Sequence, residues 1–201
     1  YGAIHMLSQG GNGGQANEDS VFWSTAHGGQ GGDGGSGGTL SMVADADDGG
    51  KTPYPITTLN ESAILLVSQG GDGGKGGKGT NQGGPHQGNG GQGGDGGHGG
   101  TITLTLSDDH AVNIQGSSQS DRQLDGNAAI SVQSRGGDGA VAGEGLSDNK
   151  ATGGTGGAGG DGGNITITAT STRNTITTRS DAVHGIWAVS AGGNGGTGGE
   201  G

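Results

Sequence analysis

The stretch from Gly88 to Leu106, GNGGQGGDGGHGGTITLTL, most constrains what this chain can fold into. Up to Gly100 a pair of glycines returns every third residue, and beyond it Ile102, Leu104 and Leu106 alternate with threonines. A three-residue period with two glycines fits a left-handed polyglycine-II-like helix, which rises about 3.1 Å per residue. The alternation predicts a half-buried strand. We therefore expect one extended backbone to pass from a glycine helix into a sheet.

This transition recurs along the chain. Glycine pairs that follow Ser-x begin at residues 10, 70, 136 and 192, which gives spacings of 60, 66 and 56 residues. We expect a single repeat domain, residues 1–201, that is a fragment of a larger protein or a filament subunit. Its units are approximately 1–60, 61–126 and 127–182, with a partial unit 183–201.

Each unit begins with a strand whose alternate positions are uniform, and uniform positions are expected inside a stack because neighbouring turns need similar volumes there. One of the columns expected inside is isoleucine, at Ile4, Ile64, Ile130 and Ile186. A serine column follows it, and we expect an inward ladder in which each hydroxyl bonds its neighbour in the next turn. Its members are Ser8, Ser68, Ser134 and Ser190.

Two more strands complete each turn in this prediction. One follows the long glycine run, with inward residues such as Leu40 and Ile102, and a short one lies around Ile56, Ile114 and Ile176. Successive turns lie about 4.8 Å apart, which leaves no room for side chains between adjacent glycine helices. The sequence predicts an all-β, right-handed β-solenoid with three short strands per rung and projecting polyglycine-II-like arms.

Composition alone favours a different interpretation, because 56 glycines among 201 residues and 2% aromatic residues are typical of flexible linkers. The strict triplet phase favours order, but the linker alternative stays open. A net charge of −11 argues against binding to nucleic acid or to anionic membranes. The chain has no cysteine and no apolar run long enough to span a membrane, so we expect no direct membrane insertion.

The segment from Thr175 to Gly201 resembles the recurring unit of large bacterial autotransporter (type V secreted) passenger domains. The matching residues are Ile176 to Thr178, Asp181, Ala182, His184 to Ile186, Ser190 and the glycines after it. The resemblance implies a secreted, cell-surface β-solenoid whose usual role is adhesion, with no catalytic residues to carry over. The partners it implies are neighbouring repeats or copies stacked head-to-tail and a host or surface receptor.

Side-chain chemistry agrees with a structural role, since no nucleophile lies in a pattern with a general base. We therefore predict a non-enzymatic extracellular scaffold, a stalk or fibre-forming repeat of a bacterial surface adhesin. No cofactor is expected, with calcium as the possible exception because stacked carboxylates repel unless they are solvated, bonded to N–H groups or bridged by a cation. The calcium candidates are Asp33, Asp95, Asp72 and Asp138.

Two other surfaces offer binding functions. Outward threonines are expected to form a flat array that is similar to the surfaces of ice-binding proteins, although threonine is also a common outward strand residue. The array consists of Thr101, Thr103, Thr105, Thr166 and Thr168.

The second surface is the set of variable loops at the arm tips, residues 15–27, 79–87 and 140–152. In the first loop Val21, Phe22 and Trp23 form an apolar run. We expect this run either to cap the ends of the glycine helices or to make an adhesive contact.

Overall fold

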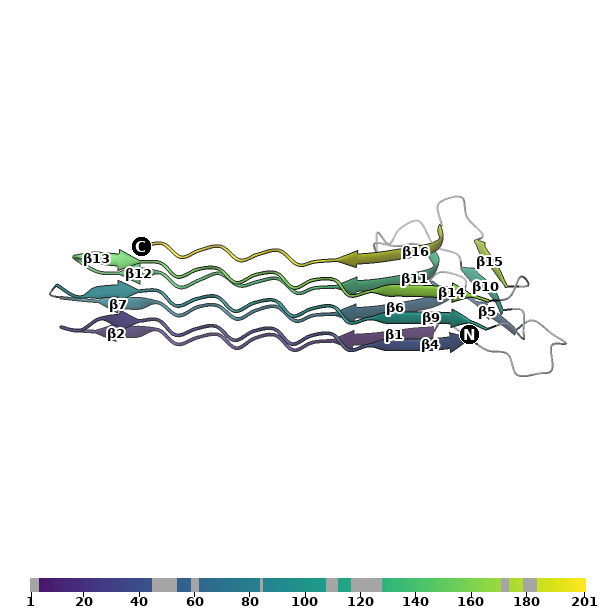
Figure 1. Cartoon of the computed structure of the whole chain (residues 1–201), viewed down its shortest axis with the longest axis horizontal. Coiled ribbons are helices and arrows are strands. Elements are labelled where there is room, and N and C mark those ends of the chain that lie inside the picture. The colour runs from purple at the N-terminus through teal and green to yellow at the C-terminus, as the bar shows by residue number, and fades with distance from the viewer. Residues whose placement is uncertain are drawn as a thin grey trace.

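The computed structural model is an elongated molecule in which strands gather at one end and extended glycine runs lead to a tip at the other (Figure 1). The structure describes residues 4–44, 54–58, 62–83, 85–107, 112–116, 128–170, 174–178 and 184–201. Every regular element in these ranges is a β-strand, which confirms the all-β class. No helix long and apolar enough to cross a membrane occurs among them.

Three parallel sheets form the body of the molecule, and each turn of the chain adds one strand to each sheet. The first sheet contains β1 (Ile4–Gln9), β6 (Ile64–Gln69), β11 (Ala128–Arg135) and β16 (His184–Ala191). The second contains β4 (Leu40–Ala44), β9 (Ile102–Leu106) and β14 (Ile165–Ala169). The third contains β5 (Tyr54–Thr57), β10 (Val112–Gly116) and β15 (Thr175–Thr178). This stacking of parallel strands is solenoid-like, as predicted.

The strand register reproduces the columns expected from the sequence. Ile64 pairs with Ile4 and with Ile130, and Ile130 pairs with Ile186. A slip of one residue would turn every inward side chain outward, so the isoleucine and leucine columns fix the register. The inward side chains form one core, whose fully buried members include Ile64, Leu66, Ile102, Leu104, Ile114, Ile130 and Val132.

Each full turn contains five strands, two more than predicted. The additional strands lie at the arm tips, where they form two further parallel sheets. One consists of β2 (Asp19–Val21), β7 (Gly79–Asn81) and β12 (Gly145–Leu146), the other of β3 (Ala26–His27), β8 (Gln87–Asn89) and β13 (Lys150–Thr152). These strands are too short to show alternation in the sequence, and they form because the turns beside them are already aligned.

Between body and tip, the chain runs outward and back in two layers. We call 10–18, 70–78, 136–144 and 192–200 the outgoing runs, and 28–38, 90–100 and 153–163 the return runs. Within the outgoing layer, Gly10 N–H donates to Gln69 O at 2.8 Å and Gly13 N–H to Asp72 O at 2.8 Å. Between the layers, Gly71 N–H donates to Gly35 O at 2.8 Å and Gly74 N–H to Gly32 O at 2.7 Å, so the layers are antiparallel.

The close spacing of the runs explains the glycines at most interior positions of this bundle. A Cβ atom built on Gly97 would overlap the carbonyl oxygen of Gly35, whereas one built on Gly14, at the edge of the stack, meets nothing within 4 Å.

The third outgoing run extends further than the predicted loop 140–152 allows. Ala140 N–H donates to Gly94 O at 3.0 Å, so residues 140–144 belong to the bundle and the loop is shorter. Ala140 and Ala142 stand where the triplet pattern has glycine, so the sequence does not show that the run continues through them.

Candidate functional site

The predicted threonines lie together on the outer face of the second sheet. Thr103 pairs with Ser41 and Thr166, and Thr105 pairs with Val43 and Thr168. The side chains on the two edge strands are exposed, and those on the central strand are partly covered. Thr101 is exposed just before β9. The face is therefore regular, but Val43, which is 62% exposed, interrupts its hydroxyl pattern.

The four aspartates considered for calcium lie in two columns on opposite layers of the arm. In the return layer, Asp33 Oδ1 accepts the N–H of Asp95 at 3.0 Å, and Asp95 Oδ1 accepts the N–H of Ala158 at 2.7 Å. In the outgoing layer, Asp72 Oδ1 accepts the N–H of Asp138 at 2.9 Å. Each carboxylate thus bonds the backbone of the next run, one of the solutions open to stacked acids.

Metal ligands do not gather into a cluster in the part of the chain that the structure describes. No group of three or more His, Asp or Glu side chains there could hold an ion. Other charged and polar side chains of the arm form isolated pairs between neighbouring runs. Lys78 Nζ lies 3.2 Å from Glu144 Oε2, and Asp161 N–H donates to His98 Nδ1 at 2.9 Å. Their arrangement follows the stacking of the runs.

The serine column is inward, but its hydrogen bonds differ from those predicted. Ser68 Oγ accepts the Gly100 N–H at 2.9 Å and donates to Gly38 O at 2.8 Å. Ser134 repeats this arrangement one turn later, accepting from Gly163 N–H and donating to Gly100 O, each at 2.8 Å. The hydroxyls therefore join the first sheet to the return layer rather than to each other. A serine has one O–H to donate, and at Ser68 and Ser134 a glycine carbonyl of the return layer accepts it.

The apolar run at the arm tip projects into solvent. Phe22 is 65% exposed and Trp23 is 71% exposed, whereas Val21 is partly covered within β2. Trp23 has a φ of 64°, which is rare for a bulky residue and strained. The turn is supported by the next one, because Asn81 Nδ2 donates to Ser24 O.

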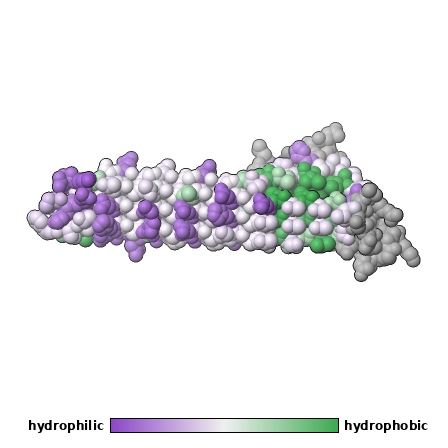
Figure 2. All heavy atoms as spheres, viewed as in Figure 1, coloured by the Kyte–Doolittle hydropathy of each residue, from purple (hydrophilic) through white to green (hydrophobic). Residues whose placement is uncertain are grey.

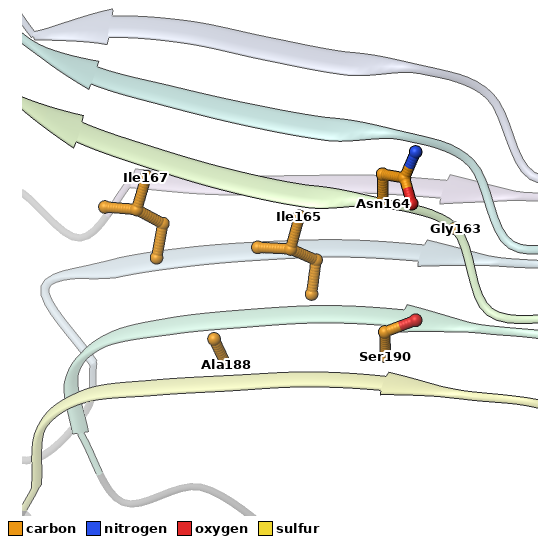
Figure 3. A pocket seen from close by; sticks show the side chains of 6 residues that line it. All are labelled: Gly163, Asn164, Ile165, Ile167, Ala188 and Ser190. Carbon is orange, nitrogen blue, oxygen red and sulfur yellow. The ribbon is translucent and has the colours of Figure 1, made fainter.

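β14 and β16 are edge strands of their sheets among the described residues. An open hollow of about 390 Å³ lies between these two strands, lined by Gly163, Asn164, Ile165, Ile167, Ala188 and Ser190 (Figure 3). Its apolar residues occupy columns that are fully buried one turn lower. The sequence pattern did not predict this hollow.

No protein-family model matches the chain. No curated protein matches it either. A comparison with solved structures finds the nine polyproline type II helical bundle antifreeze protein of the springtail Granisotoma rainieri. The identity is 20% over 96% of this chain and 93% of that protein, with a TM-score of 0.23. A likeness at this level supports no inference about fold or function.

Proposed function

We propose that this chain is a non-enzymatic structural repeat of a secreted bacterial surface adhesin, a stalk or fibre-forming scaffold of the autotransporter passenger type. In this proposal the solenoid is right-handed, the runs are polyglycine II helices, and no cofactor is needed. Asp181 and Ala182, which carry part of the resemblance, lie outside the described residues.

The observation that carries this proposal is the continuous hydrogen bonding of the arm from body to tip. Bonds such as Gly73 N–H to Asp138 O and Gly94 N–H to Gly74 O, each at 2.9 Å, hold every interior run to runs in both layers. Apolar side chains gather at the body, while the arm presents glycine and polar residues (Figure 2). Such an arm is a stiff support that can hold a contact surface away from the body.

The tip is the contact surface that this proposal assigns. Two exposed aromatic residues on a rigid support, one of them the strained Trp23, favour contact with a partner over capping, because a cap would bury the Phe22 and Trp23 rings. A surface or host receptor is the proposed partner, and binding of nucleic acid or insertion into a membrane is not part of the proposal.

The test compares beads coated with the normal chain and with the double variant Phe22→Ser, Trp23→Ser on a panel of cell and abiotic surfaces. Leu7→Ser is the matched control, since Leu7 is 70% exposed but lies on β1, in the body. We expect the tip variant alone to lose adhesion while its melting temperature stays unchanged. Equal adhesion of the two variants would refute the contact, and a lowered melting temperature of the tip variant would favour capping.

The regular hydroxyl face favours a second candidate, an ice-binding or other ligand-binding surface. Ser41, Thr103 and Thr166 lie in one row across the second sheet. Thermal hysteresis of the purified chain tests this candidate, with the variant Thr103→Val, Thr166→Val as a comparison. Hysteresis that disappears in the variant would support ice binding, and its absence from the normal chain would exclude it.

A further inference from the structure

The tripeptide Asn164-Ile165-Thr166 is one of two N-x-S/T sequences in the chain, and the fold places it on the surface. The other begins at Asn60, which lies outside the described residues. N-x-S/T is the acceptor pattern for attachment of a sugar to an asparagine side chain at an accessible site. Because such a tripeptide also arises by chance, its place in the structure decides whether it is a candidate site.

The backbone at Asn164 is held in register with the turn below it. The Asn164 carbonyl accepts the Ile102 N–H at 2.8 Å, and the Thr101 carbonyl accepts the Leu40 N–H at 2.9 Å in the same way one turn lower. Asn164 therefore stands in the same column as Thr101, immediately before β14.

The side chain of Asn164 lies on the outer face of the second sheet. Figure 3 shows its amide on the side of β14 opposite to Ile165 and Ile167. Alternate residues of an extended chain share a face and lie about 6.6 Å apart. The Asn164 amide and the Thr166 hydroxyl, both exposed, therefore face solvent together, while Ile165 between them packs against the core.

Exposure in this column is a property of the face rather than of an edge strand. Thr101 is exposed although β9, which it precedes, pairs with β4 on one side and β14 on the other. Thr39, in the turn below, is exposed as well. The side chain of Thr101 makes no hydrogen bond among the described residues, so its neighbours in the stack neither cover it nor bind it. The accessibility of Asn164 follows from the same geometry.

Other asparagines of the stack have structural hydrogen bonds. Asn12 Oδ1 accepts the Asp72 N–H at 3.0 Å, and Asn149 Nδ2 donates to Pro85 O at 3.1 Å. The Asn164 side chain makes no hydrogen bond within the part of the chain that the structure describes. A group attached to its Nδ2 atom therefore breaks no contact of the fold.

We propose that Asn164 is the attachment site of an N-linked glycan. The donor is a sugar activated at C1 by a phosphate ester, either a nucleoside diphosphate sugar or a lipid-linked pyrophosphate sugar, and a separate transferase brings it to the chain. The Asn164 Nδ2 atom forms a bond to C1 while the bond between C1 and the phosphate oxygen breaks. The phosphate leaves with the electron pair of that bond, and Nδ2 loses one proton to a base of the transferase.

A glycan at this position changes what the hydroxyl face can bind. It would stand beside Thr101 and Thr166, within the array considered for ice binding, and a bulky, flexible group there keeps a flat solid away from the face. Modification of Asn164 and ice binding by this face therefore exclude each other. The tip lies at the opposite end of the molecule (Figure 1), so its contacts are unaffected and the proposal goes beyond the scaffold function without depending on it.

The test uses the 201-residue chain with Asn60→Gln, in which Asn164 begins the one N-x-S/T tripeptide left. In one experiment the chain is co-expressed in the bacterial cytoplasm with a soluble N-glycosyltransferase that uses a nucleoside diphosphate hexose. In the other it is secreted by a eukaryotic host, whose transferase uses a lipid-linked oligosaccharide. We expect mass spectrometry of the intact chain and its peptides to find one glycan, on Asn164, and the experiment that yields it identifies the donor class. Absence of the glycan from both would overturn the proposal.

Matched variants connect the modification to the structure. Asn164→Gln and Thr166→Val should carry no glycan, whereas Thr166→Ser, which keeps the hydroxyl, should carry one. Thr101→Asn combined with Asn164→Gln recreates the tripeptide Asn-Ile-Thr one turn lower in the same column and should also carry one. Failure of this variant beside a modified Asn164 would mean that access comes from the edge strand, which overturns the argument from the face.

Thermal melting shows whether the folded chain tolerates the glycan. The melting temperature of the modified chain, followed by circular dichroism, should be the same before and after enzymatic removal of the glycan, because the group projects from the outer face into solvent. A glycan found only on chain without a cooperative melting transition would overturn the proposal.

Discussion

The Oδ1 atom of Asp72 accepts a hydrogen bond from the backbone N–H of Asp138 at 2.9 Å, although 66 residues separate the two along the chain. Asn12 Oδ1 accepts the N–H of Asp72 in the same way, and Asp138 Oδ1 accepts that of Asn194. The third N–H of each triplet points away from the bundle, and this column gives it a partner. A short side chain that ends in an oxygen acceptor is therefore useful at this position.

Two substitutions at Asp72 distinguish the contribution of its hydrogen bond to stability from the contribution of its negative charge. Asp72→Ala should lower the free energy of unfolding by about 0.5–1.5 kcal/mol, the usual net contribution of one hydrogen bond. Asp72→Asn keeps an oxygen at the same place and should be nearly neutral. Chemical denaturation followed by circular dichroism measures both variants. If the Asn variant were as unstable as the Ala variant, the charge rather than the hydrogen bond would be responsible.

Calcium is expected to leave the stability of the chain unchanged. One oxygen of Asp72 and one of Asp95 already accept backbone N–H groups, and the described residues offer no cluster of three ligands. Calcium added to chelator-treated protein should produce neither heat in a calorimetric titration nor a rise in melting temperature. A rise that Asp72→Asn and Asp95→Asn abolish would restore the calcium hypothesis.

The position of a glycine in the stack should decide how well it tolerates a methyl group. Gly97→Ala places a Cβ against the carbonyl oxygen of Gly35, and we expect a loss of about 1–3 kcal/mol, as for other overpacked sites. Gly14→Ala meets nothing within 4 Å and should be neutral or stabilising by about 0.4–1 kcal/mol, because the unfolded chain loses freedom. Thermal melting of both variants checks the difference, and equal losses would mean that the runs are not packed as described.

Much of the body could be predicted because its signals are local. The columns of Ile64 and Leu66 repeat in every turn, and the change of period at Gly100 marks where a run becomes a strand. The tip strands could not be predicted, since two or three residues such as Gly145–Leu146 show no period of their own. They depend on the alignment of distant turns.

The partners of the candidate residues were harder to predict than their positions. The sequence pattern predicts the inward column of Ser68, but its partners Gly38 and Gly100 belong to the return layer, and only the packing of the layers brings them near. The triplet pattern predicts the aspartate columns, whereas the N–H group that donates to each side chain depends on the offset between adjacent runs.

Removal of the Ser68 hydroxyl should be more costly than removal of an exposed one. Ser68→Ala leaves the N–H of Gly100 and the carbonyl of Gly38 without this buried partner, and we expect a loss of about 1–3 kcal/mol. Ser36→Ala, at an exposed third position of the first return run, should change stability by less than about 0.5 kcal/mol. Denaturation curves give the two energies, and amide hydrogen exchange should show faster exchange of the Gly100 N–H only in the Ser68 variant. Unchanged protection of Gly100 in that variant would mean that the hydroxyl does not join the sheet to the return layer.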